Sequence, residues 1–259
     1  MSKLIIKLTF TAWAVAFIFA VVIISFFMLP DFSADGALTL GHGATFAILG
    51  AFIFAMAGFG ISNTLALRNY ENRHVLSKEK QGLLAFAEPL QLAHGESFRT
   101  FRLLSIAKKE ARVMLTAEGW NISDEKNAKD ALERLSTASE CVACSAENAT
   151  KIPAYRATRE YLLQTGFPQE MLDNLQSYAA YDYGRTAFIA RLCARVKFIS
   201  EEDAWRFVEC AANNARQLYN NWHEYIAAYV LGRALALGEF TPWTFEHRKG
   251  SPFLLFPFK

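Results

Sequence analysis

The residues with the clearest capacity for chemistry lie in the last third of the chain, where charged side chains recur beside glycines. Asp182 and Arg185 are three positions apart, a spacing that places both side chains on one face of a helix. Arg233 follows Gly232 and would approach Arg185 if the two helices pack antiparallel. Two arginines beside a carboxylate can hold a carboxylate or phosphate group. The same spacing also fits a structural ion pair inside the fold.

Large aromatic residues and one histidine accompany these charges. Trp205 and Trp222 stand near expected helix starts, where such side chains either anchor the packing between helices or stack on a ligand. His223 lies between Trp222 and Glu224, so it could act as a general base or simply stand exposed on a first helical turn. The candidate ligand or motif residues are Tyr181, Asp182, Gly184, Arg185, Trp205, Trp222, His223, Gly232 and Arg233.

Cysteine could supply metal or redox chemistry at Cys141 and Cys144, which form a CxxC pair. One such pair is half of a tetrahedral zinc site, and a redox role requires a βαβ context that the sequence does not suggest. Cys193 and Cys210 fall inside apolar helical patterns, where free cysteine packs well. We therefore expect no cofactor and no metal, with Cys141 and Cys144 as weak zinc candidates.

Amphipathic helices separated by short loops must position these residues. Apolar side chains recur at helical spacing in segments 97–117, 123–139, 155–164, 168–178 and 181–196. Two N-cap patterns, Ser200 before Asp203 and Asn221 before Glu224, predict helices 201–218 and 222–237. Because we find no convincing alternation with period two, we predict an all-α domain over residues 97–259. Its tail, from Phe240 onward, is expected to lie extended over the surface.

Two long apolar runs without charge occupy the N-terminal region, at residues 8–29 and 44–67. A transmembrane helix needs about 20 such residues, so the runs predict a two-helix hairpin joined by an external loop over 30–43. A cleaved signal peptide is disfavoured because the first run is too long and lacks a small-residue cleavage site. Residues 1–7 form the expected cytoplasmic N-terminus, and residues 68–96 form a juxtamembrane connector.

The flanking charges predict the orientation of this hairpin. The only charged residues of the connecting loop are aspartates. The basic residues lie at the ends of the two runs that face away from this loop, and they are Lys3, Lys7, Arg68, Arg73, Lys78 and Lys80. The positive-inside rule then places both termini in the cytoplasm of a two-pass protein of the bacterial inner membrane. Neither run contains an ionisable residue, which argues against a proton or ion pathway. Small residues in the second run could allow self-association.

The distribution of charge disfavours nucleic acid as a partner. Residues 1–80 hold six basic and four acidic side chains, and the remaining 179 residues hold 21 of each. A domain that draws affinity from the phosphate backbone usually has a basic excess. The sequence also lacks a phosphate-binding GxxxxGK[ST] loop, a GxSxG nucleophile turn, an HExxH metal motif and a Gly-rich dinucleotide loop.

Four spaced motifs carry a resemblance to a known family. They are Tyr181-Asp-Tyr-Gly-Arg185, Phe198-Ile-Ser-Glu-Glu-Asp-Ala-Trp205, Tyr219-Asn-Asn-Trp222 and Tyr229-Val-Leu-Gly-Arg233. Together with Glu118-Gly-Trp-Asn-Ile122 they resemble the uncharacterised bacterial family called domain of unknown function 1266, over roughly residues 100–257. The chain departs from the usual pattern at Tyr181 and Phe253, where that family more often has tryptophan. The resemblance implies a shared fold but no established activity, and it does not include the hairpin.

These observations leave three functional hypotheses. The first is a membrane-anchored interaction or regulatory module that binds a protein partner or a small anionic ligand, with the lipid bilayer as a further partner. The alternative is a membrane-tethered hydrolase or transferase that acts on an anionic substrate through Asp182, Arg185 and Arg233, with His223 as a further candidate. The third is a role within the membrane, as a small pore or an immunity-like partner of a membrane-active toxin.

Overall fold

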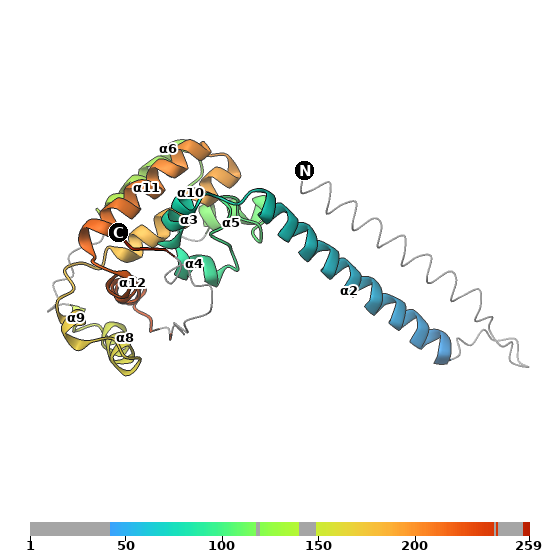
Figure 1. The fold of residues 1–259 in the computed structure, drawn as a ribbon, viewed down its shortest axis with the longest axis horizontal. Helices are drawn as coiled ribbons and strands as arrows, with labels where there is room; N and C mark the ends of the chain where they lie inside the picture. Colours follow the sequence, from blue (N-terminus) through green and yellow to red (C-terminus); the bar gives the residue numbers. More distant parts are fainter. Residues whose placement is uncertain (1–41, 118–119, 140–148, 241, 243–255) are drawn as a thin grey trace, which may run out of the picture. The chain divides into compact units, whose positions relative to one another are not determined.

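The computed structural model describes residues 42–117, 120–139, 149–240, 242 and 256–259, which belong to two compact units. The first unit comprises residues 1–74 and the second comprises residues 75–259. Throughout the described residues the regular secondary structure is helical, which confirms the all-α prediction (Figure 1). The second unit has its own hydrophobic core.

The first unit is described by one long helix, α2 (His42–Arg73), which contains the second apolar run. Several of its large apolar side chains are exposed: Phe52, Ile53, Met56, Ile61 and Leu65. In the described part of the chain, no helix has both the length and the apolar character needed to cross a membrane. The first apolar run, residues 8–29, lies outside the described residues. The hairpin expected from the sequence is therefore unconfirmed.

The second unit is built around α10 (Ala180–Val196), whose side chains are buried on almost every face. It packs against α4 (Glu88–Ala93), α5 (Lys108–Ala117) and α6 (Glu125–Thr137) as well as against two later helices. Those two are α11 (Glu201–Leu218) and α12 (Trp222–Leu237). The remaining helices are α3 (Lys78–Ala85), α8 (Pro153–Gln164) and α9 (Gln169–Asp173). In Figure 1, α6 and α11 run side by side, and they are also in contact.

The helix starts predicted from capping residues are confirmed. The Ser200 hydroxyl accepts a hydrogen bond of 2.9 Å from the Asp203 backbone N–H, and α11 begins at Glu201. The Asn221 side chain accepts one of 2.9 Å from the Glu224 backbone N–H, and α12 begins at Trp222. Each cap satisfies a backbone donor that has no partner within its helix.

The helix expected over residues 97–117 is wrong in its first half, because α5 begins only at Lys108. Residues 97–107 form a series of bends whose backbone groups bond to buried side chains instead. The Glu96 carboxylate accepts backbone hydrogen bonds from Leu104, Ser105 and Ile106, at 2.8 to 2.9 Å. From the opposite side, the Arg191 guanidinium donates to the carbonyl oxygens of Ser97, Thr100 and Phe101, also at 2.8 to 2.9 Å.

Two of the last four residues are buried, so the expected surface position of the tail is wrong for Phe256 and Phe258. Phe256 and Phe258 are each only 7% exposed. The Trp222 indole N–H donates to the Phe256 carbonyl, and the Arg216 Nε–H donates to the Phe258 carbonyl, both at 2.9 Å. Burial of two phenylalanine rings stabilises the fold by more than an extended surface position would. Phe256 and Phe258 therefore belong to the core.

Candidate functional site

The motif residues meet where α10 crosses α12. A Cβ atom added to Gly184 would lie 2.6 Å from the Tyr229 ring, and one added to Gly232 would lie 2.5 Å from the Tyr178 carbonyl oxygen. The Gly232 position also faces Tyr181, at 3.0 Å from its Cβ. Gly184 of α10 thus faces Tyr229 of α12, and Gly232 of α12 faces Tyr181 of α10. The two glycines of the motifs let the helix backbones approach closely.

One turn of α10 holds the charged pair expected from the sequence. Arg185 Nη2 donates to Asp182 Oδ1, and the Asp182 side chain is 6% exposed whereas the Arg185 side chain is 23% exposed. The Arg185 guanidinium also lies over two rings, 4.2 Å from the centroid of Tyr181 and 5.2 Å from that of Trp120. Among the described residues, Arg185 Nε has no hydrogen-bond partner. Asp182 and the two rings therefore orient a guanidinium that remains partly open to solvent.

Arg233 contributes positive charge to the same region. Burial raises the pKa of the Tyr229 hydroxyl above its usual range, Tyr181 raises it further, and the charges of Arg185 and Arg233 oppose the rise. Both arginines therefore lie close enough to Tyr229 to act on one phenol. Arg185 is the cation of this region that is both held in one orientation and partly exposed, which suits it to binding an anionic group.

The other aromatic candidates lie away from this pair. Trp205 is 7% exposed and contacts the Phe101 ring, at 4.9 Å between centroids. Trp222 is 8% exposed and packs against Phe86, at 4.7 Å between centroids. Both tryptophans are packing anchors of the core. His223 is exposed, its ring lies 6.1 Å from that of Phe167, and no described contact joins it to Asp182 or Arg185.

The structure does not test the cysteine candidates for a metal site. Cys141 and Cys144 lie outside the described residues. Within the described residues, no group of three histidine, cysteine or acidic side chains could hold a metal ion. Cys193 is buried, and burial raises the pKa of its thiol to about 12. That thiol is protonated at neutral pH and acts as a small apolar side chain.

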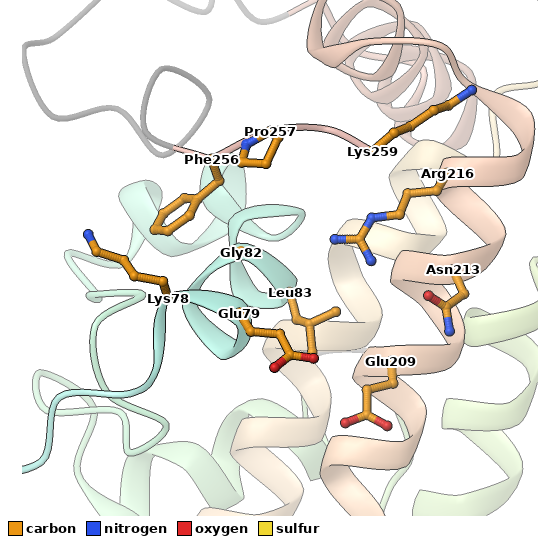
Figure 2. Close-up of a pocket in the computed structure, with 10 residues that line it drawn as sticks. All are labelled: Lys78, Glu79, Gly82, Leu83, Glu209, Asn213, Arg216, Phe256, Pro257 and Lys259. Atoms are coloured by element: carbon orange, nitrogen blue, oxygen red, sulfur yellow. The ribbon is translucent and has the colours of Figure 1, made fainter.

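Two features of the fold were missed from the sequence, one at the Arg185 site and one away from it. Trp120 was noted only at the edge of the family pattern, although it stacks on Arg185. A groove of about 740 Å³ between α3, α11 and the C-terminal residues was not expected at all (Figure 2). The recurrence of Gly-Arg in α10 and α12 was the one sequence signal that related the two motif helices.

Comparison with known families accounts for the spacing of these motifs. A family model described as protein of unknown function 1266 matches residues 115–244, which is half of the chain. The chain belongs to this family. Comparisons with curated proteins and with solved structures found no match. Within this member of family 1266, the matched segment holds Trp120 and all of α6 and α8–α12, so it contains both arginines of the site. The groove of Figure 2 is lined partly by residues on either side of it.

Alkaline titration of this family member should leave at least Tyr225 and Tyr229 un-ionised until the chain unfolds. Burial raises the pKa of both Tyr225 and Tyr229. Above the ordinary tyrosine pKa of about 10, the unfolded chain releases these protons and the folded chain does not, so stability falls as pH rises. Arg191, whose pKa burial lowers to about 10, and Arg216, whose pKa burial also lowers, act in the opposite direction, whereas Cys193 acts in the same direction as the tyrosines.

The measurement is phenolate absorbance followed together with circular dichroism. We expect the last phenolate signals to emerge with the loss of helix. Full ionisation of every tyrosine while the helical signal is intact would show that Tyr225 and Tyr229 are not sealed in the core.

Proposed function

We propose that this chain is a membrane-anchored interaction or regulatory module, in which residues 75–259 bind an anionic group of a protein partner or a small ligand. The observation that carries the proposal is the state of Arg185. Its guanidinium is fixed by Asp182 and by two aromatic rings, yet its side chain is still 23% exposed. An arginine held in one orientation loses little conformational entropy when it binds a carboxylate or phosphate.

The neighbourhood of Arg185 favours a carboxylate-bearing protein partner. Arg233 adds a second cation near the Tyr229 phenol, and Asp182, which pairs with Arg185, is nearly sealed. Trp120 and Tyr181 are partly exposed next to Arg185. Arginine and large aromatic residues are the types enriched at the centres of protein interfaces.

Anchoring in the bacterial inner membrane is the second part of the proposal. Its support is the pair of uncharged apolar runs, 8–29 and 44–67, and the basic residues that flank them. The exposed apolar side chains on α2, such as Ile53, Ile61 and Leu65, add to this support because water solvates them poorly. In this proposal the chain crosses the membrane twice, and both termini are cytoplasmic.

The enzyme alternative gains no support from the site. General acid–base chemistry requires its groups to converge on one open space that a substrate can enter. Asp182 is sealed by Arg185, and His223 lies against Phe167. None of the four candidate residues lines the groove of Figure 2 or the smaller groove between α6 and α11. These candidates are Asp182, Arg185, His223 and Arg233.

Substitution of Arg185 by glutamine should abolish partner binding without unfolding the domain. The experiment is quantitative co-purification of the full-length chain from membranes solubilised in a mild non-ionic detergent. A charge-assisted hydrogen bond is worth about 1.5–3 kcal/mol, so recovery of the partner should fall by roughly tenfold or more. Arg159→Gln is the matched control, because Arg159 also pairs with an aspartate, Asp173, and is not one of the motif residues.

Thermal melting of each variant, and of the conservative variant Arg185→Lys, accompanies this comparison. Partner recovery that is equal in wild type, Arg185→Gln and Arg159→Gln would contradict a role for Arg185 in binding. Unfolding of both Arg185→Gln and Arg185→Lys would show that Arg185 serves the helix crossing alone.

A further inference from the structure

A charged groove lies between the start of the second unit and its end (Figure 2). Its volume is about 740 Å³, within the range of about 300–1,000 Å³ that is usual for small-molecule sites. Residues from three separate parts of the chain line it: Lys78, Glu79, Gly82 and Leu83; Glu209, Asn213 and Arg216; and Phe256, Pro257 and Lys259. None of these residues belongs to the site around Arg185.

The polar side chains of the groove come from two helices. Glu209, Asn213 and Arg216 follow one another at four and three positions along α11, so they share one face of that helix. Glu79 stands in the first turn of α3, opposite α11. In Figure 2 the Arg216 guanidinium and the carboxylates of Glu79 and Glu209 face the interior, whereas the ammonium groups of Lys78 and Lys259 point outward at the rim.

Arg216 is held in place by the end of the chain. Its Nε–H donates to the Phe258 carbonyl at 2.9 Å, and its guanidinium lies 5.5 Å from the centroid of the Phe86 ring. Burial lowers the pKa of Arg216, and the charge of Glu79 opposes that shift. Across the described residues, its two terminal nitrogens have no hydrogen-bond partner. They are therefore available to a ligand in a fixed geometry.

The charges of the interior are not paired with one another. No ion pair joins Arg216 to Glu79 or to Glu209 within the part of the chain that the structure describes. Two carboxylates and one guanidinium give the interior a net charge of one negative unit. Its complement is a ligand with one anionic group and two cationic groups, which is the charge pattern of a basic amino acid.

We propose that this groove binds a cationic amino acid, with the ligand carboxylate on the terminal nitrogens of Arg216 and its two ammonium groups on Glu79 and Glu209. Guanidinium and carboxylate match each other in a two-pronged arrangement, and carboxylates accept from ammonium groups. Asn213 lies between Glu209 and Arg216 on α11 and can bond to either end of the ligand. This proposal does not depend on the membrane anchor or on the role of Arg185.

The test is calorimetric titration of the full-length chain in a maltoside detergent. Lysine is the probe, and two analogues each remove one charge: norleucine lacks the side-chain ammonium, and cadaverine lacks the carboxylate. Each lost charge-assisted contact should weaken binding by roughly tenfold or more. Nα-acetyl-lysine separates a free amino acid from the C-terminal lysine of a peptide, because it blocks only the α-ammonium.

Two variants test whether the ligand binds in the groove. Glu209→Gln should weaken the binding of lysine by roughly tenfold and should leave that of norleucine unchanged if Glu209 holds the side-chain ammonium. Glu201→Gln, which makes the same charge change on α11 outside the groove, should leave both unchanged. Lysine that does not bind, or that binds equally to wild type and to Glu209→Gln, overturns the proposal. Equal affinities for lysine, norleucine and cadaverine also overturn it.

Discussion

Substitution of Gly232 by alanine should lower the free energy of unfolding by about 2 kcal/mol. The added Cβ would lie 2.5 Å from the Tyr178 carbonyl oxygen and 3.0 Å from the Tyr181 Cβ. Overpacking of this kind costs typically about 1–3 kcal/mol, and the contact with a backbone oxygen cannot be relieved by a side-chain rotation. The higher helix propensity of alanine, about 1 kcal/mol, offsets only part of that cost. Urea unfolding followed by circular dichroism measures the difference.

Gly82→Ala is the matched control for this substitution. Gly82 also lies in a helix, but its added Cβ would meet the Phe256 ring at an ordinary 3.7 Å. Its expected effect is therefore zero or a gain of up to about 1 kcal/mol from helix propensity. If Gly232→Ala proved as stable as Gly82→Ala, the close crossing of α10 and α12 would be incorrect.

Removal of residues 256–259 should lower the free energy of unfolding by about 5 kcal/mol or more. Truncation of one buried phenylalanine to alanine already costs about 3–5 kcal/mol, and both Phe256 and Phe258 are buried. The deletion also leaves the Trp222 indole and the Arg216 Nε–H without their carbonyl partners. Chemical unfolding of the truncated chain beside wild type measures the loss.

Deletion of Lys259 alone is the control, since that residue is exposed. It should change stability by less than about 0.5 kcal/mol, as surface changes generally do. A truncated chain that unfolds at the same urea concentration as wild type would mean that the C-terminal residues lie on the surface.

The helices that were predicted best from the sequence are those whose starts depend only on neighbouring residues. Helices α11 and α12 begin where Ser200 and Asn221 cap them, because a cap acts within three residues along the chain. The bends over 97–107 could not be predicted in this way. They are held by Arg191, which lies about 90 residues further along the chain, and helical spacing of apolar residues in that segment gave no sign of it. The burial of Phe258 depends in the same way on distant partners, Phe86 and Trp222.

The candidate site was predictable in its residue types more than in its construction. The spacing of Asp182 and Arg185 predicted an ion pair, and the structure contains it. The sequence did not show that the glycine beside each arginine accommodates the opposite helix, since this requires the relative placement of α10 and α12. The groove of Figure 2 could not be predicted from the sequence either. Its interior charges come from helices about 130 residues apart in the sequence.

NMR can show directly whether Arg185 is held ready for an anionic group. The arginine Nε–H signals of residues 75–259 would be recorded while a short oligo-glutamate peptide is added, with Arg185→Lys used to assign the signal of Arg185. The account predicts that this signal shifts with peptide concentration while that of Arg191, which is 1% exposed, stays fixed. An Arg185 signal that does not move in a folded domain would contradict the account and leave Arg185 with a structural role only.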